Sequence, residues 1–172
     1  PVLWHMETSG RDREDKDDYK LKVDISFCIS NTVNVIEYYH NSSFLEHGGS
    51  PDKALQNAFV YAIDQYLKQN NKYTKTESKI KFVDVADSLL LVGNSLSTMT
   101  SYENQTKKAT SNKFIQEAMT ECLPDELNIN FIDTKMDAEK QCGQVLVNKR
   151  SRESGEKTRI NVKIKVGGSL DI

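Results

Sequence analysis

Several groups of residues in this sequence have types and spacings that could support chemistry. His40, Glu46 and His47 could ligate a metal ion, but zinc sites need three or four ligands in tight groups, and the chain contains neither Cys-x-x-Cys nor His-x-x-x-His. Asp84 and Asp87 could form an acid–base pair, yet their place between two expected strands favours a turn or solvent exposure. We therefore predict no catalytic residue, no metal site, no cofactor and no enzymatic activity.

A glycine-rich segment precedes an expected helix. Gly48-Gly49-Ser50 could bind a phosphate on free backbone N–H groups at the helix start. The segment lacks a Walker lysine and a strand that leads directly into it, which favours an ordinary helix start.

The strongest charge feature is a basic stripe near the end of the sequence. Residues 144–149 and 157–166 are predicted to form a hairpin around Glu153-Ser154-Gly155-Glu156, because apolar and basic residues alternate in the second segment. A basic strand face can neutralise phosphates without reading sequence, and it can equally protect a sheet edge from aggregation. The residues assigned to possible nucleic-acid binding are Lys149, Arg150, Arg159, Lys163 and Lys165.

Two elements that would position such side chains follow from periodicity. Apolar residues alternate with polar ones over 21–29, which predicts a strand with one buried face. Ser50 and Pro51 form a good helix start, and apolar residues recur at helical spacing over 51–69. We expect the strand to pack against the helix through Leu21, Val23, Ile25 and Phe27 on one side and Leu55, Phe59 and Ile63 on the other.

The remaining patterns complete an α+β fold class. We predict an antiparallel-rich sheet packed against one long helix and followed by the β-hairpin. The minor elements are a polar linker over 1–18, a short helix over 32–40, strands around 80–85 and 89–92, a loop over 94–112, a short helix over 113–122 limited by Pro124, and a strand over 127–131.

Composition excludes some classes of protein. The chain has 172 residues, of which 37% are hydrophobic and 28% charged, and its net charge of -2 gives no global attraction to nucleic acid or membrane. No apolar run approaches the roughly 18 residues needed to span a bilayer. Its three cysteines are widely spaced, which argues for a reducing compartment. We expect a cytoplasmic or nuclear location, no membrane partner, and a segment excised from a longer protein.

Several segments, taken in order, carry a resemblance to one protein family. They are Tyr19–Ile25, Ile36–Tyr39, Ser50–Gln56, Leu91–Ser95, Phe114–Gln116, Leu127–Asn130 and the hairpin over Gly143–Val166. In this order they resemble the linker region of Argonaute proteins, between the N and PAZ domains, and the final hairpin is similar to the opening strands of a PAZ domain. Asn94 and Leu96 depart from the family, which has Arg and Phe there.

The resemblance implies an Argonaute linker-like α+β domain over 19–134 and a PAZ-like hairpin over 143–172, and it favours strand rather than helix over 113–122. It implies a non-catalytic segment that supports small-RNA binding in RNA-guided silencing. The expected partners are small RNA and the remaining Argonaute domains or other proteins. An alternative stays open, in which the chain is a stand-alone α+β protein-interaction domain with no nucleic-acid role.

Overall fold

The fold is built on a strand whose side chains alternate between apolar and polar. In β2 (Tyr19–Ile29), Leu21, Val23 and Ile25 are buried, whereas the intervening Lys22 and Asp24 are exposed. Because successive side chains of a strand point to opposite faces, this pattern buries one face of the sheet and exposes the other. The strand predicted over residues 21–29 is confirmed.

The computed structural model describes the backbone of residues 2–30, 33–46, 48–98, 109–110 and 112–170, and side chains as far as residue 156 except at 48, 50, 109 and 110. The main sheet has five strands in the order β1-β2-β6-β3-β4. Neighbouring strands are antiparallel except for β3 and β6, which are parallel, so the sheet is mixed. The strands that join β2 are β1 (Val2–Gly10), β6 (Leu89–Ser97), β3 (Val35–His40) and β4 (Ser43–Phe44); β5 (Gly48–Gly49) and β7 (Ala109–Thr110) form a separate parallel pair.

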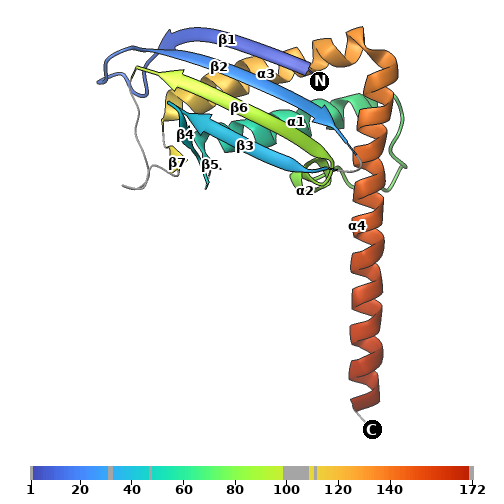
Figure 1. Ribbon diagram of the computed structural model, residues 1–172. Coiled ribbons are helices and arrows are strands. Elements are labelled where there is room, and N and C mark those ends of the chain that lie inside the picture. The colour runs from blue at the N-terminus through green and yellow to red at the C-terminus, as the bar shows by residue number, and fades with distance from the viewer. Residues whose placement is uncertain (1, 31–32, 47, 99–108, 111, 171–172) are drawn as a thin grey trace.

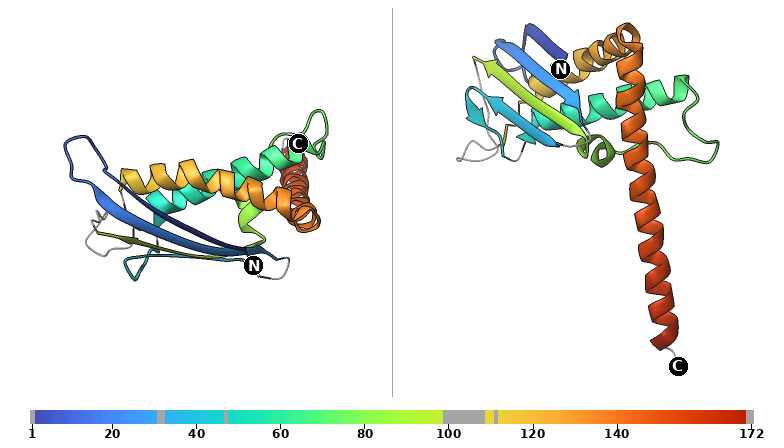
Figure 2. Two further views of the ribbon diagram at one scale, coloured as in Figure 1. Left: turned by 90° about the horizontal axis from the view of Figure 1, so that it is seen from above. Right: turned by 45° about the vertical axis from the view of Figure 1, so that its right-hand side comes forward.

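Helices α1 (Ser50–Gln69) and α3 (Lys113–Asp133) cover one face of the sheet and leave the other face open (Figure 2). The rings of Phe27 and Phe59 meet edge to face with centroids 5.0 Å apart, which confirms the predicted packing of the strand on the 51–69 helix.

Gly49 caps α1 with a φ of 97°, a conformation that favours glycine. Gly49 therefore takes the N-cap position that the sequence suggested for Ser50.

Gly93 of β6 lies against a buried tyrosine ring. A Cβ at this position would sit 2.6 Å from a ring carbon of Tyr38, which is 4% exposed. Gly93→Ala is expected to destabilise the fold by about 1–3 kcal/mol, since overpacking forces neighbours off their preferred positions. Urea denaturation would measure this loss. Gly155→Ala is the matched control, because a Cβ there meets no described atom within 4 Å; equal effects of the two changes would contradict the prediction.

The C-terminal third is helical, which corrects the predicted hairpin. Residues 143–166 lie within α4 (Lys135–Leu170), a continuous helix that extends beyond the sheet layer (Figure 1). The hairpin interpretation gave weight to alternating valine and isoleucine near the end of the chain. The structure instead follows a helical stripe further upstream, where buried residues recur every three or four positions at Ala138, Cys142, Val145, Leu146 and Lys149.

Helix α3 contains the short helix predicted over 113–122, which is confirmed, and continues through the strand predicted over 127–131, which is wrong. The alternation of Leu127, Ile129 and Phe131 indicated a strand, but Leu127 and Phe131 are buried one helical turn apart and Ile129 is 51% exposed. Pro124 lies inside this helix and does not end it. The strand that the Argonaute resemblance favoured over 113–122 is therefore wrong.

The part of the chain before α3 differs from the sequence interpretation in four further places. Residues 2–10 form β1, paired with β2 along its length, where a linker was expected. Residues 35–40 form a strand rather than a helix, and 82–86 form the short helix α2 (Phe82–Ala86) rather than a strand. Of the predicted loop over 94–112, residues up to 97 continue β6 and 109–110 form β7, while 99–108 and 111 lie outside the described residues.

The predicted α+β class is confirmed, with a mixed five-stranded sheet. The single long helix is wrong, because α1, α3 and α4 are all long, with 20, 21 and 36 residues. Among the described residues, no helix is both long and apolar enough to cross a membrane.

Candidate functional site at the middle of helix α4

Helix α4 is fastened to the rest of the fold by charged side chains rather than by apolar packing alone. One stretch of the helix, residues 148–156, faces the segment between the end of α1 and the start of β6. We call the paired charges in this contact the α4 joint; they are Glu77, Asp84, Lys149, Arg150, Arg152 and Glu153.

The first half of the joint centres on a buried lysine. The side chain of Lys149 is 0% exposed, and its Nζ lies 3.1 Å from Glu77 Oε1 and 3.2 Å from Glu153 Oε1. The ammonium also lies 5.9 Å from the ring centroid of Tyr73, within cation–π range. Arg150 Nε donates to Glu77 Oε1 at 3.0 Å, so one carboxylate holds two cations of α4.

The second half of the joint is a bidentate pair. Arg152 donates through Nε and Nη2 to the two carboxylate oxygens of Asp84, at 2.7 and 3.2 Å. Asp84 has a side chain that is 0% exposed, and it also accepts the backbone N–H of Lys81 at 2.8 Å. Asn148 completes the contact by donating to the Asp84 carbonyl and to the Ser88 hydroxyl. The fork geometry of arginine fixes direction as well as distance, so this pair sets the orientation of α4 on α2.

Several charged groups of the joint shift the pKa values of their partners. The Arg150 guanidinium, with the Thr74 backbone N–H and Lys149, lowers the pKa of Glu77 to about 2 against desolvation that would raise it. Lys149 likewise lowers the pKa of Glu153. Hydrogen bonding to Asp84 raises the pKa of Arg152. Glu77, Glu153 and Arg152 therefore stay charged at neutral pH.

The depressed pKa of Glu77 predicts a loss of stability in acid. A carboxylate whose folded pKa lies below its ordinary value of 4.5 contributes stability above that value, and the contribution disappears as pH falls toward about 2. The unfolding free energy should therefore fall more steeply in the wild type than in Glu77→Gln between about pH 5 and pH 2. His40, whose burial lowers its pKa to about 4, titrates in both proteins and cancels in the comparison. Parallel pH profiles would contradict the prediction.

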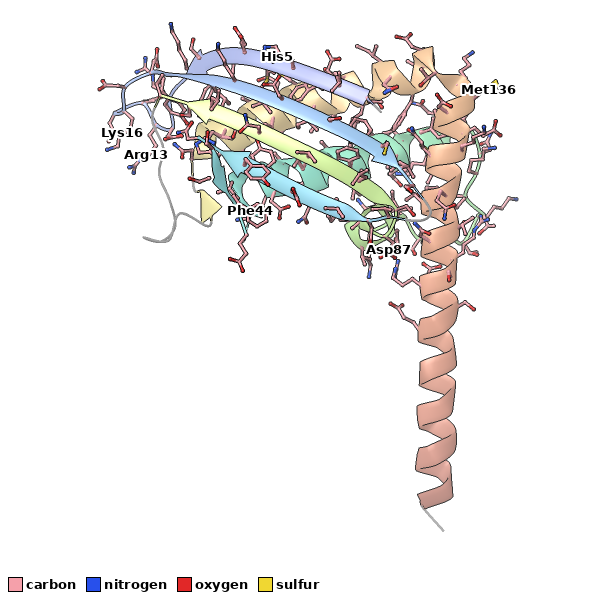
Figure 3. The ribbon with its side chains drawn as sticks, in the orientation of Figure 1. His5, Arg13, Lys16, Phe44, Asp87 and Met136 are labelled. Atoms are coloured by element: carbon pink, nitrogen blue, oxygen red, sulfur yellow. The ribbon has the colours of Figure 1, made fainter. Side chains whose placement is uncertain are left out.

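The geometry suits mechanical attachment better than acid–base or nucleophilic chemistry. Every carboxylate of the joint is hydrogen-bonded to a cation of α4, so each is engaged in the contact between segments rather than presented to a substrate. A cavity of about 500 Å³ lies beside it, lined by Asp87, Asn148, Ser151, Arg152, Gly155 and Glu156. Figure 3 places Asp87 at the end of the sheet next to α4.

The structure separates the five basic residues that were assigned to nucleic-acid binding. Lys149 and Arg150 both form ion pairs with Glu77, and the Lys149 side chain is buried, so its ammonium is not presented to solvent. Arg159, Lys163 and Lys165 lie on the α4 backbone, but their side chains are outside the described part of the chain. These three residues were expected on one face of a strand, but residues 157–166 are helical, so that strand face is absent. Their role in binding nucleic acid stays a prediction.

The residues considered for acid–base catalysis and for metal binding do not come together in one site either. Asp84 faces Arg152 instead of forming a pair with Asp87, which is exposed. His40 is buried in the sheet and hydrogen-bonded to Ser95, while His47 lies outside the described residues. Within the described ranges, no three His, Cys, Asp or Glu side chains gather into a group that could hold a metal ion.

Sequence reasoning missed the partners of the joint. Glu77 lies between the predicted helix over 51–69 and the strand predicted around 80–85, a stretch with no predicted element, and Arg152 lies next to the turn of the predicted hairpin. One signal was available: Cys142, Val145, Leu146 and Lys149 follow helical spacing, which would have put Arg152 and Glu156 on an adjoining stripe of the same helix.

Comparison with known proteins identifies the fold and its family. A model of the DNA gyrase B family matches residues 3–161, which is nearly the whole chain. The chain belongs to the DNA gyrase B family. The DNA gyrase B protein of Mycoplasma pneumoniae is 24% identical over 147 residues, which are 82% of this chain and 22% of that protein. The Mycoplasma genitalium protein is 24% identical over 149 residues, 83% of this chain and 23% of its own length. The chain thus spans between a fifth and a quarter of these relatives.

Solved structures show the same fold. The 43K ATPase domain of Thermus thermophilus gyrase B, in complex with an aminocoumarin, superposes with a TM-score of 0.68 at 17% identity, over 90% of this chain and 40% of that one. The topoisomerase IV ATP-binding domain of Francisella tularensis gives a TM-score of 0.65 at 21% identity, over 85% of this chain and 39% of that one.

These findings correct the functional predictions. The Argonaute resemblance is wrong, and with it the RNA-silencing role, the small-RNA partner and the Argonaute domains as partners. The alternative of a stand-alone interaction domain without a nucleic-acid role also conflicts with a DNA gyrase family. The prediction of no enzymatic activity is overturned by the match to the DNA gyrase B family. The segments that suggested Argonaute are short, and each follows from common strand or helix patterns.

Proposed function

We propose that this chain is a segment of a gyrase-B-type protein and contributes to ATP hydrolysis coupled to work on DNA. The observation that carries the proposal is the family match over residues 3–161, supported by the fold shared with two ATP-binding regions of topoisomerases. The partners would be DNA and the other subunits of the enzyme, inside the cell. The remaining parts of the ATPase region would lie elsewhere in the full protein, because this chain covers 40% of the Thermus domain.

Within that role, the α4 joint would link the ATPase region to the rest of the enzyme. Helix α4 has 36 residues, so it reaches about 54 Å, and its C-terminal part extends away from the sheet and the other helices (Figure 1). Two sets of directional ion pairs hold α4 near its middle. The helix would therefore rotate together with the sheet and the helices to which it is attached. A movement of the α/β body would therefore be passed along α4.

The proposal is tested in the full-length protein by measuring ATP hydrolysis and ATP-dependent change of DNA topology. Charge reversal at the joint, as Arg152→Asp, should abolish the change of topology, because it places two carboxylates together at the buried contact with Asp84. The double swap Asp84→Arg with Arg152→Asp should restore a substantial part of the activity by re-forming an ion pair.

Lys113→Glu is the matched control, since Lys113 forms an exposed pair with Glu117 on α3, away from the joint. A wild-type protein without ATP-dependent activity on DNA would reject the proposed function itself. Full activity of Arg152→Asp would reject only the role of the joint.

A further inference from the structure

The first strand of the sheet has a free edge that lacks the usual protection. β1 is the terminal strand, and among the described strands it pairs only with β2. Its register runs without a bulge from Val2 opposite Phe27 to Gly10 opposite Tyr19. The nine residues contain neither Lys nor Pro, two residue types with which proteins commonly blunt an exposed edge. A long unprotected edge offers a row of backbone N–H and C=O groups to another strand.

A partly apolar groove lies beside the start of this edge. Helix α3 lies along β1, so that Gly10 is close to the ring of Phe114 at one end and Trp4 shares a cavity with Leu123 and Leu127 at the other. The cavity holds about 360 Å³ between the start of β1 and the second half of α3. Leu3 at its margin is 83% exposed. Large side chains of an added strand would therefore find apolar surface here.

The far rim of the groove is acidic. Glu126, Asn130 and Asp133 lie four and three residues apart, which places them on one stripe of α3, and all three line the cavity. Glu126 and Asp133 are exposed, and neither has an ion-pair partner among the side chains that the structure describes. Carboxylates in this position favour a ligand with Lys or Arg side chains.

We propose that β1 and the Glu126–Asp133 stripe of α3 form a docking groove for an extended, basic segment of a partner polypeptide. The segment would add to the sheet by backbone hydrogen bonds to β1, as extended peptides do at free edges. Because side chains alternate along a strand, every second residue would face α3, with apolar groups in the cavity and long cations over Glu126 and Asp133. The groove shares no residue with the α4 joint, and the inference does not rest on the proposed function.

The charge of the rim argues for a foreign segment rather than a second copy. Pairing of two β1 edges about a twofold axis would bring the same surface of each copy together. The acidic stripes of both copies would then lie in one interface, where like charges repel. A basic segment meets the same surface with opposite charge.

The experiment uses as the probe a capped nine-residue peptide, Thr-Val-Thr-Lys-Thr-Val-Thr-Lys-Thr, in which Val and Lys share one face of the strand. We call it the Val-Lys peptide. Trp4 is the one tryptophan of the chain and lies in β1 at the cavity, so its fluorescence reports occupation of the groove. We expect saturable binding that Leu3→Lys and the pair Glu126→Lys with Asp133→Lys each weaken by about tenfold or more. A peptide with Pro at alternate positions should not bind, because it lacks the backbone donors. Val83→Lys and Glu14→Lys are the controls, as both change exposed residues away from the groove.

Circular dichroism of each variant establishes that it is folded, and the two variants act on the edge and on the rim independently. Three results would overturn the proposal. The first is that the Val-Lys peptide does not bind, and the second is that the Pro peptide binds equally well. The third is that the wild-type protein forms a dimer in solution and that Leu3→Lys dissociates it. This last result would show that the edge of β1 pairs with a second copy of the chain.

Discussion

Arg152→Ala is expected to destabilise the protein by about 3–5 kcal/mol, as the loss of one partner from a buried ion pair does. The change leaves the Asp84 carboxylate, which is 0% exposed, without the two guanidinium hydrogen bonds that compensate its desolvation. Urea denaturation followed by far-UV circular dichroism measures the loss. Because α4 carries Arg152 and α2 carries Asp84, we also expect faster proteolysis of α4 in the variant.

Lys113→Ala provides the comparison for Arg152→Ala. Lys113 pairs with Glu117 one turn away on α3, and both side chains are more than half exposed. Pairs of this kind contribute about 0.3–0.5 kcal/mol. A similar small loss in Arg152→Ala would mean that water replaces the guanidinium at Asp84, and the joint would not hold α4.

Phe59→Ala is expected to cost about 3–5 kcal/mol, the usual range for deleting a buried phenylalanine ring. Phe59 is 1% exposed and packs edge to face on Phe27, so the substitution removes contact between α1 and β2 and leaves a cavity between them. The midpoint of chemical denaturation should fall accordingly, with little change in its slope.

Tyr61→Ala is the matched change on the same helix. Tyr61 is 54% exposed, so its loss should alter the unfolding free energy by about 0.5 kcal/mol or less. Equal effects of Phe59→Ala and Tyr61→Ala would show that the α1–β2 contact is not the core of the fold.

The sequence was informative where one face of an element is buried along its whole length. In β2 the alternation of Leu21, Val23 and Ile25 with polar residues has only one physical solution, a half-buried strand. In α1 the spacing of Leu55, Phe59 and Ile63 has a similarly direct solution, and these two elements pack on each other as expected. Local pattern and tertiary contact agree here, because each element needs the apolar face of the other.

The sequence misled where two periods coexist. Leu127, Ile129 and Phe131 fit a strand, and Leu123, Leu127 and Phe131 fit a helix; the structure chooses the helix because that face meets α1, where Tyr66 packs on Phe131. Isoleucine and valine near the end of the chain favoured a hairpin in the same way. A short apolar alternation does not reveal whether a neighbouring element is present to bury it.

By itself, the sequence determined the α+β class, strand β2 and the helix α1 that packs on it. Only the tertiary structure decided that Lys149 and Arg152 face inward, because their partners Glu77 and Asp84 are more than sixty residues away in the chain. A lysine or arginine is read as a surface residue unless its counter-charge is known, since burying a charge is unfavourable without one. The basic residues that suggested a nucleic-acid surface therefore became, in part, the internal attachment of α4, and what brought them there was the folding of two distant segments against each other.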